Sequence, residues 1–168
     1  PPPAPPPAGP ARLFSTAPFC RPVLVAVTRG GRHGGARGGP RSRRRELLDI
    51  NRAATDFYRK ELESSEGADA REYLRNRGIG TAIAERFELG YAPNEWSRLG
   101  DHLRRLGEDA ELAEVAGLLV PRKSGNGTYD RFRDRLMCPI AIPSGEIAGF
   151  SGRLVHDSDD SGRGRRGS

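Results

Sequence analysis

Three arginines alternate with other residue types in the densest run of charged side chains in this sequence. The run is Tyr129-Asp130-Arg131-Phe132-Arg133-Asp134-Arg135, followed by Leu136 and Met137. Side chains two residues apart on a strand point to the same face, which predicts that the guanidinium groups of Arg131, Arg133 and Arg135 lie together. Arginine presents a planar fork that matches phosphate oxygens, so a sugar-phosphate backbone is a natural counterpart. An ion-pair ladder with Asp130, Asp134 and nearby acids is the alternative.

A glycine-rich motif follows at Gly149-Phe150-Ser151-Gly152-Arg153. Its two glycines, Gly149 and Gly152, allow another backbone to approach closely, just before a positively charged side chain. As a phosphate cradle, this pattern is a weak signal when it stands alone.

Five short helices are predicted ahead of these motifs, because apolar residues recur there at steps of three and four. They are expected at 46–63, 68–77 and 81–87, then after the caps Ser97 and Asp109. Gly78, Gly107 and Gly117 are expected to end the second, fourth and fifth helices. The residues expected to face inward are Leu47, Ile50, Ala54, Phe57, Ala70, Tyr73, Leu74, Ile83, Phe87, Leu99, Leu103, Leu106, Leu112 and Val115.

Extended segments are predicted after the helices, at 118–120, 129–132, 137–142 and 146–155. Pro143-Ser144-Gly145 should form the hairpin turn between the last two. The stretch 88–93 contains Gly90 and Pro93, which predicts a tight, buried turn there. Helices first and strands later favour an α+β fold that ends in a small antiparallel sheet.

The two ends of the chain differ from its middle in charge. Residues 1–45 hold nine arginines and no acid, and 163–168 hold three more, which leaves 16 basic against 22 acidic side chains between them. The proline, glycine and arginine content predicts disorder over 1–45 and 156–168, around a domain at 46–155. An organellar transit peptide, or an incorrect reading frame of GC-rich DNA, would also account for the composition of residues 1–45.

The remaining composition narrows the class of protein. Cys20 and Cys138 form no Cys-x-x-Cys pair, so neither a zinc ribbon nor a disulfide framework is indicated, and a reduced, intracellular protein is expected. Cys138 is expected to be a small buried residue in a strand. His33, His102 and His156 are scattered and form no ligand set. The longest apolar run, at 22–27, is far shorter than the roughly 20 residues that cross a bilayer.

Several of these motifs together resemble the bacterial DnaG-type DNA primase family. The family's RNA polymerase domain contains Tyr-Asp-Arg-Phe-Arg-x-Arg-hydrophobic-Met-x-Pro-Ile and then Gly-Phe-x-Gly-Arg, which stand here at 129–140 and 149–153. The resemblance covers 46–155, the N-terminal part of the catalytic core. Its upstream parts are Ile50-Asn51-Arg52-Ala53-Ala54, Ala70-Arg71-Glu72-Tyr73-Leu74, Arg77-Gly78, Arg86-Phe87 and Leu89-Gly90-Tyr91-Ala92-Pro93.

The resemblance implies a nucleic-acid-binding role for five arginines. Two of them match family arginines that lie in the basic groove holding template and primer, namely Arg77 and Arg153. The proposed nucleic-acid-binding set is Arg77, Arg131, Arg133, Arg135 and Arg153, with Tyr129, Asp130, Gly149 and Gly152 in support. The chain departs from the family at Cys138, where Phe is usual, and at Ser151, where Gly is usual.

No catalytic residue is expected in this chain. Joining ribonucleotides needs divalent metal ions held by clustered carboxylates, and the resemblance implies that these Mg²⁺ ligands lie further along, in a Toprim fold. The Zn²⁺ ligands of the family's zinc ribbon are also absent. The candidate acids here alternate with arginine or lie in the predicted tail; they are Asp130, Asp134, Asp157, Asp159 and Asp160.

The leading hypothesis is therefore a piece of a DNA primase, the DNA-directed RNA polymerase that makes replication primers, inactive by itself. Its expected partners are single-stranded DNA template, RNA primer and nucleoside triphosphates, with the replicative helicase bound through an absent C-terminal region. The family implies a cytoplasmic site at the bacterial replisome, with no membrane contact. A stand-alone nucleic-acid-binding module, with affinity from its arginine tails, and a non-functional truncated relic are the alternatives.

Overall fold

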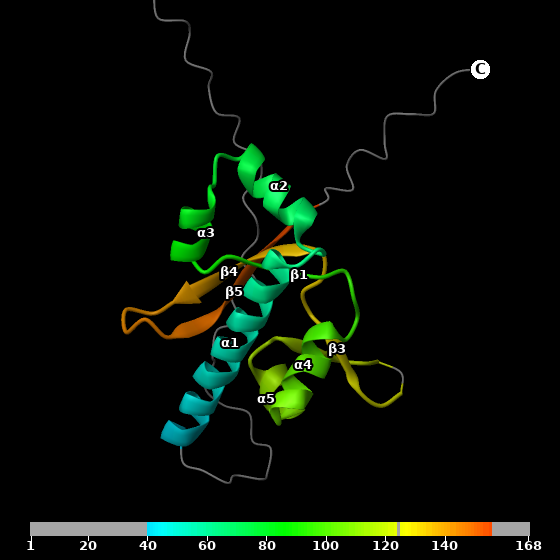
Figure 1. Cartoon of the computed structure of the whole chain (residues 1–168). Helices are drawn as coiled ribbons and strands as arrows, with labels where there is room; N and C mark the ends of the chain where they lie inside the picture. The colour runs from blue at the N-terminus through cyan, green and yellow to red at the C-terminus, as the bar shows by residue number, and fades with distance from the viewer. Residues whose placement is uncertain (1–39, 124, 156–168) are drawn as a thin grey trace, which may run out of the picture.

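One long helix, α1, organises the molecule. The computed structural model describes residues 40–123 and 125–155, and α1 spans Pro40–Glu63. It begins six residues before the predicted start, so residues 40–45 are helical rather than disordered; proline is compatible with a first helical turn. The predicted disorder of 1–39 and 156–168 falls outside the described residues. In Figure 1, α1 lies against the sheet, with α2 and α3 near its C-terminal end.

Four short helices follow, as the apolar spacing predicts: α2 (Ala68–Asn76), α3 (Thr81–Arg86), α4 (Arg98–Leu106) and α5 (Ala110–Val115). Gly107, with φ of 82°, ends α4 in the left-handed conformation that favours glycine. The side chain of Asp109 accepts a hydrogen bond from the Glu111 amide, which confirms it as the cap of α5. Ser97 precedes α4 but makes no capping bond; its hydroxyl donates to Asp101 instead.

Two small antiparallel sheets complete the α+β fold. The first has the order β1-β4-β5, formed by β1 (Gly90–Ala92), β4 (Arg135–Ala141) and β5 (Ile147–Leu154). The second pairs β2 (Leu119–Pro121) with β3 (Thr128–Asp130). The hairpin turn predicted at 143–145 is confirmed, because the Gly145 amide donates to the Ile142 carbonyl at 2.8 Å.

Within the segment 88–93, which was predicted to be a tight, buried turn, residues 90–92 form the edge strand β1 instead. All three residues of β1 are buried, and they pair with β4 from Gly90↔Met137 to Ala92↔Arg135. Gly90 runs so close to α1 that an added Cβ would lie 2.5 Å from the Cβ of Tyr58. Glycine at this position therefore allows the strand to pack directly on the helix.

The apolar residues form two clusters, one on each side of the larger sheet. The main core joins α1 to α4, α5 and one face of the sheet, with Ile50, Tyr58 and Met137 almost fully buried. The second lies between α2 and the other face, around Leu74 and Tyr91. Five residues predicted to be buried are instead exposed, because they lie on outward faces of short helices or of β4: Ile83, Phe87, Leu106, Val115 and Cys138.

Candidate nucleic-acid interface

The arginine-rich run does not form a single strand, so the prediction that Arg131, Arg133 and Arg135 share one strand face is wrong. Strand β3 ends at Asp130 and β4 begins at Arg135. Between them the chain turns, and Asp134 adopts a left-handed φ of 49°. The three guanidinium groups consequently belong to different surroundings: Arg131 is exposed on the turn, Arg133 packs on aromatic rings, and Arg135 lies beside Gly152.

Asp130 is buried and serves as the cap of α4 from 30 residues away in sequence. Its two carboxylate oxygens accept hydrogen bonds from the amides of Leu99 at 2.7 Å and Gly100 at 3.0 Å. Burial raises the pKa of this carboxyl, and the two amide bonds act in the opposite direction. No ion pair within 40–123 and 125–155 involves Arg131, Arg133 or Arg135, so the proposed ion-pair ladder is not formed there.

Arg133 lies on an aromatic pair formed by the exposed Trp96 and the partly buried Tyr129. Its guanidinium carbon is 4.0 Å from the centre of the Trp96 ring and 5.5 Å from that of Tyr129. The two rings meet edge to face with centroids 5.6 Å apart, and Trp96 is 60% exposed. We call Trp96, Tyr129 and Arg133 the tryptophan platform. Sequence reasoning missed Trp96, although a single tryptophan in a polar loop directly after Pro93 was an available signal.

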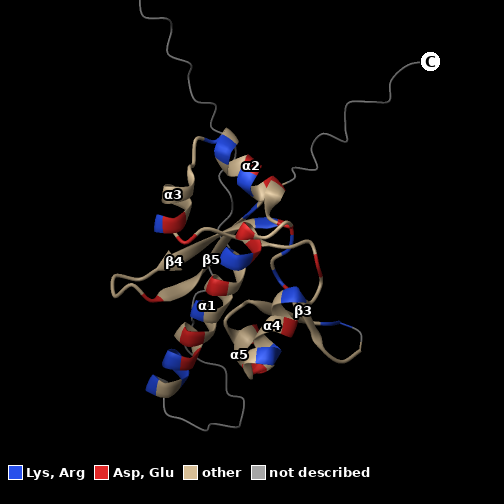
Figure 2. Cartoon of the chain, viewed as in Figure 1, with Lys and Arg blue, Asp and Glu red and all other residues tan. Residues whose placement is uncertain are grey.

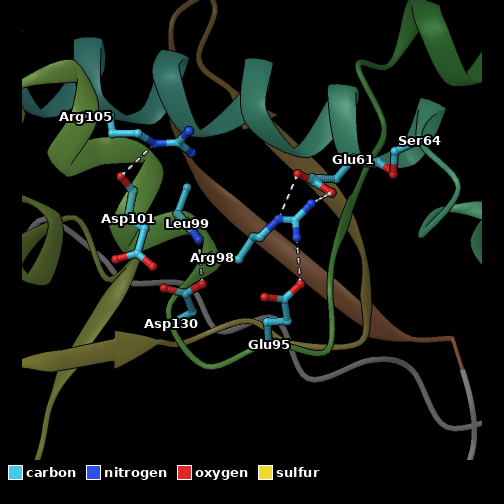
Figure 3. A network of polar contacts seen from close by, with 8 residues as sticks. All are labelled: Glu61, Ser64, Glu95, Arg98, Leu99, Asp101, Arg105 and Asp130. Carbon is cyan, nitrogen blue, oxygen red and sulfur yellow. Dashed lines mark hydrogen bonds and ion pairs between the residues drawn. The ribbon is translucent and has the colours of Figure 1, made fainter.

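A network of polar contacts fixes the loop that carries this platform (Figure 3). Arg98 lies between Glu61 of α1 and Glu95 of the loop, with nitrogen–oxygen distances of 3.3 and 2.8 Å. The Asp130 amide also donates to the Trp96 carbonyl at 2.8 Å. Glu61 is only 9% exposed but the Arg98 side chain is 41% exposed, so this pairing is partly shielded from solvent and links the loop to α1.

Arg77 and Arg153 approach the same aromatic ring from different elements. Arg77 follows α2 and Arg153 belongs to β5, and their guanidinium carbons lie 5.1 and 6.0 Å from the centre of the Tyr73 ring. We call these three residues the tyrosine site. Neither arginine takes part in an ion pair among the described residues. The Nε of Arg153 is buried and has no hydrogen-bond partner within the same part of the chain.

The two sites lie at the same end of the larger sheet. Arg135 at the start of β4 pairs with Leu154 at the end of β5 and with Ala92 of β1. Asp134 joins these elements, since it accepts a hydrogen bond from the Tyr91 hydroxyl at 3.1 Å and its carbonyl accepts from the Val155 amide. The fold thus brings Arg77, Arg133 and Arg153, which belong to three separate segments, to the same end of the larger sheet.

The two glycines of the 149–153 motif have different surroundings. A Cβ on Gly152 would lie 3.1 Å from Arg135 and 3.2 Å from Phe132, so this glycine makes room for the protein's own side chains. Nothing lies within 4 Å of a Cβ built on Gly149. Only Gly149 therefore leaves open space beside the backbone for another molecule.

No group of three or more His, Cys, Asp or Glu side chains within 40–123 and 125–155 is arranged to hold a metal ion. The residues present there do not fit a catalytic metal site, and Asp130 in particular is committed to capping α4. Asp157, Asp159 and Asp160 lie outside the described residues. Of the helices that the structure describes, none combines the length and apolar character needed to span a bilayer.

This geometry defines an α+β domain with arginines packed on aromatic rings at its surface. Residues 57–162 match the model of the DNA primase catalytic core, N-terminal domain, and the chain belongs to that family. It is 46% identical over 116 residues to the DNA primase of Synechococcus elongatus and 44% identical over 119 residues to that of Mycolicibacterium smegmatis. These matches cover 68% and 71% of this chain but only 17% and 18% of the relatives.

Solved primase structures share this fold. One is the RNA polymerase domain of Mycobacterium tuberculosis primase DnaG in complex with a double-stranded DNA oligomer carrying a 6-nucleotide overhang. It has a TM-score of 0.64 and 42% identity, over 68% of this chain and 35% of that one. Another is a DnaG primase catalytic domain bound to single-stranded DNA, with a TM-score of 0.62 and 32% identity, over 70% of this chain and 38% of that one. The resemblance drawn from the sequence is confirmed.

Proposed function

We propose that this chain binds single-stranded template DNA, as the DNA-holding part of a primase catalytic core. The observation that carries the proposal is the pair of arginine–aromatic sites at one end of the sheet. Arginine contacts phosphates, while an exposed ring stacks on any base, so together they suit a strand without a fixed sequence. Binding of single-stranded DNA by a solved relative supports the same conclusion.

Each site would contribute a different interaction. In the tyrosine site, Arg77 and Arg153 would contact the sugar-phosphate backbone, because neither is neutralised by an ion pair among the described residues. In the tryptophan platform, the exposed face of Trp96 would stack on a base, with Tyr129 holding its edge. Arg131 and Arg135 would add positive charge between the two sites, and Gly149 would leave space for the strand.

Primer synthesis would belong to the longer protein of which this domain is a part. The parts of the relatives outside the matched 17–18% of their length would bind the catalytic Mg²⁺, the Zn²⁺, the nucleoside triphosphates and the replicative helicase. The role of the chain's own residues is to bind and orient the template and the primer end. The described residues therefore predict DNA binding without nucleotide transfer.

A charge-matched pair of variants tests the proposal. Arg77 and Arg75 are both exposed at the end of α2, but only Arg77 lies over the Tyr73 ring. We expect Arg77→Gln to weaken binding of a fluorescent single-stranded oligonucleotide and to lower the slope of log affinity against log salt by about 0.7, the value for one phosphate contact. Arg75→Gln should change both quantities less. Equal effects of the two variants would rule out a specific tyrosine site.

A further inference from the structure

The first two turns of α1 carry a group of four exposed arginines, of which only Arg44 and Arg45 form ion pairs among the described residues. Arg41, Arg43, Arg44 and Arg45 follow one another closely, and all four are exposed. The first turn contains no acidic residue. Figure 2 shows lysine and arginine positions in blue at this end of α1, near the turn of the β4–β5 hairpin. We call these four residues the arginine patch.

The remainder of α1 is balanced, in contrast to its start. Arg52 pairs with Asp56 and Glu88, both at 2.7 Å, and Arg59 lies 3.7 Å from Glu88. Within the patch, the two pairs are longer and more exposed: Arg45 to Asp49 at 3.6 Å and Arg44 to Glu146 at 3.8 Å. Arg41 and Arg43 take part in none of the ion pairs that the described residues form.

Positive charge is concentrated at this end of α1, and the ion pairs to Asp49 and Glu146 that oppose it are long and exposed. A helix N-terminus is the positive end of the helix dipole, so cations there repel it as well as one another. An anion bound at the patch would relieve both repulsions. The guanidinium groups of these four arginines are spread over two successive turns and do not converge on a pocket. This arrangement suits a chain of phosphates better than one small ion.

We infer that the arginine patch is a second contact for the sugar-phosphate backbone of a nucleic acid that already occupies the two arginine–aromatic sites. The inference rests on the proposed function. The tyrosine site lies near the opposite end of α1, because Leu74 and Ala70 of α2 pack against Leu62. A helix of 24 residues is about 36 Å long, which corresponds to about ten nucleotides at the stacked spacing of about 3.4 Å.

Oligonucleotide length therefore distinguishes the patch from the first sites. The whole chain is titrated with single strands of about 6 and about 30 nucleotides, since only the longer one can reach both ends of α1. Arg41→Gln combined with Arg43→Gln should leave the short strand unaffected and lower the salt slope for the long strand by about 1.4. The factor by which the double substitution lowers long-strand affinity should then grow about 7-fold when salt falls from about 200 to about 50 mM.

A control of equal charge accompanies this variant. Arg104→Gln combined with Arg105→Gln removes the same charge from the exposed face of α4, and both variants are checked for folding by circular dichroism. If the two double variants lose long-strand affinity equally, the effect reflects net charge rather than a specific patch, and the inference is overturned. Vesicles containing phosphatidylserine serve as a second probe. Patch-dependent vesicle binding, with long-strand affinity unchanged, would also overturn it.

The two proposals fail in different ways. If the patch is wrong, Arg77→Gln still weakens binding of the short strand, while Arg41 and Arg43 matter for neither length. If the arginine–aromatic sites are wrong, Arg77→Gln has no more effect than Arg75→Gln on the short strand, whatever the patch variants do to the long one.

Discussion

Arg77 and Arg153 are 76 positions apart in sequence, yet both guanidinium groups lie over the ring of Tyr73, at 5.1 and 6.0 Å from its centre. Two like charges beside one small ring repel each other, and an anion close to both would offset this repulsion. The ring keeps both charges close to it, because the face of an aromatic ring attracts cations. This relationship makes the tyrosine site a candidate for one phosphate held from two sides.

Removing the ring should uncouple the two arginines. Tyr73→Phe keeps the aromatic face, and we expect oligonucleotide affinity to stay close to that of the unmodified chain. Tyr73→Leu should weaken binding, and its effect should overlap with that of Arg153→Gln by about 0.5–1 kcal/mol in a double-mutant cycle. Strictly additive effects would mean that the ring does not position Arg153.

Trp96 should report and contribute to base stacking. It is the only tryptophan in the chain, so its fluorescence can be observed without substitution. We expect quenching when a single strand binds, and we expect Trp96→Leu to weaken binding by about 1–3 kcal/mol per stacked base with little change in salt slope. Leu106→Ala, at another exposed apolar residue, is the matched control. Unquenched fluorescence at saturation would remove Trp96 from the interface.

Asp130 should stabilise the fold and the tryptophan platform together. In Asp130→Asn, an amide nitrogen replaces one carboxylate oxygen and faces the amide of Leu99 or Gly100, which leaves a buried donor unpaired. We expect a loss of about 1–3 kcal/mol in the free energy of unfolding, measured by urea denaturation. Asp101→Asn removes an exposed carboxylate nearby and should cost less than about 0.5 kcal/mol. A similar loss in both variants would contradict the capping role.

His102 should make stability depend on pH. Its ring lies against that of Phe57, with centroids 4.9 Å apart and an interplanar angle of 37°. Burial, helped by the positive charges of Arg105 and Lys60 and opposed by Glu61, lowers its pKa below the ordinary 6.5. The unfolded chain therefore binds the proton more readily, so the free energy of unfolding should fall as the pH drops through the unfolded pKa toward the folded one.

The variant His102→Phe isolates this contribution, because it keeps an aromatic ring on Phe57 without a titrating group. Urea denaturation at about pH 7.5 and about pH 5.5 should show a smaller decline for the variant than for the unmodified chain. Carboxylates titrate in both proteins and cancel in the comparison. Identical declines would show that the His102 pKa is the same in the folded and unfolded chains.

Local sequence patterns predicted most of the secondary structure. Apolar spacing located all five helices, and Gly107 and Asp109 marked boundaries where the structure has them. The 143–145 turn and the last two strands were also predictable from turn residues and alternation. The predictions were weaker for short helices, where Ile83 and Leu106 are apolar but exposed, because one apolar residue on a six- to nine-residue helix does not fix which face is covered.

The sequence by itself determined the family, the α+β order of elements and the identity of the candidate binding arginines, because these depend on motifs and on periods of 3.6 and 2 residues within short stretches. Tertiary structure alone decided which of them meet. A left-handed turn at Asp134 separates Arg131, Arg133 and Arg135, while strand pairing and helix packing bring Arg153 to Tyr73 and Asp130 to α4. Such contacts join residues 30 to 80 positions apart, and no local period encodes them.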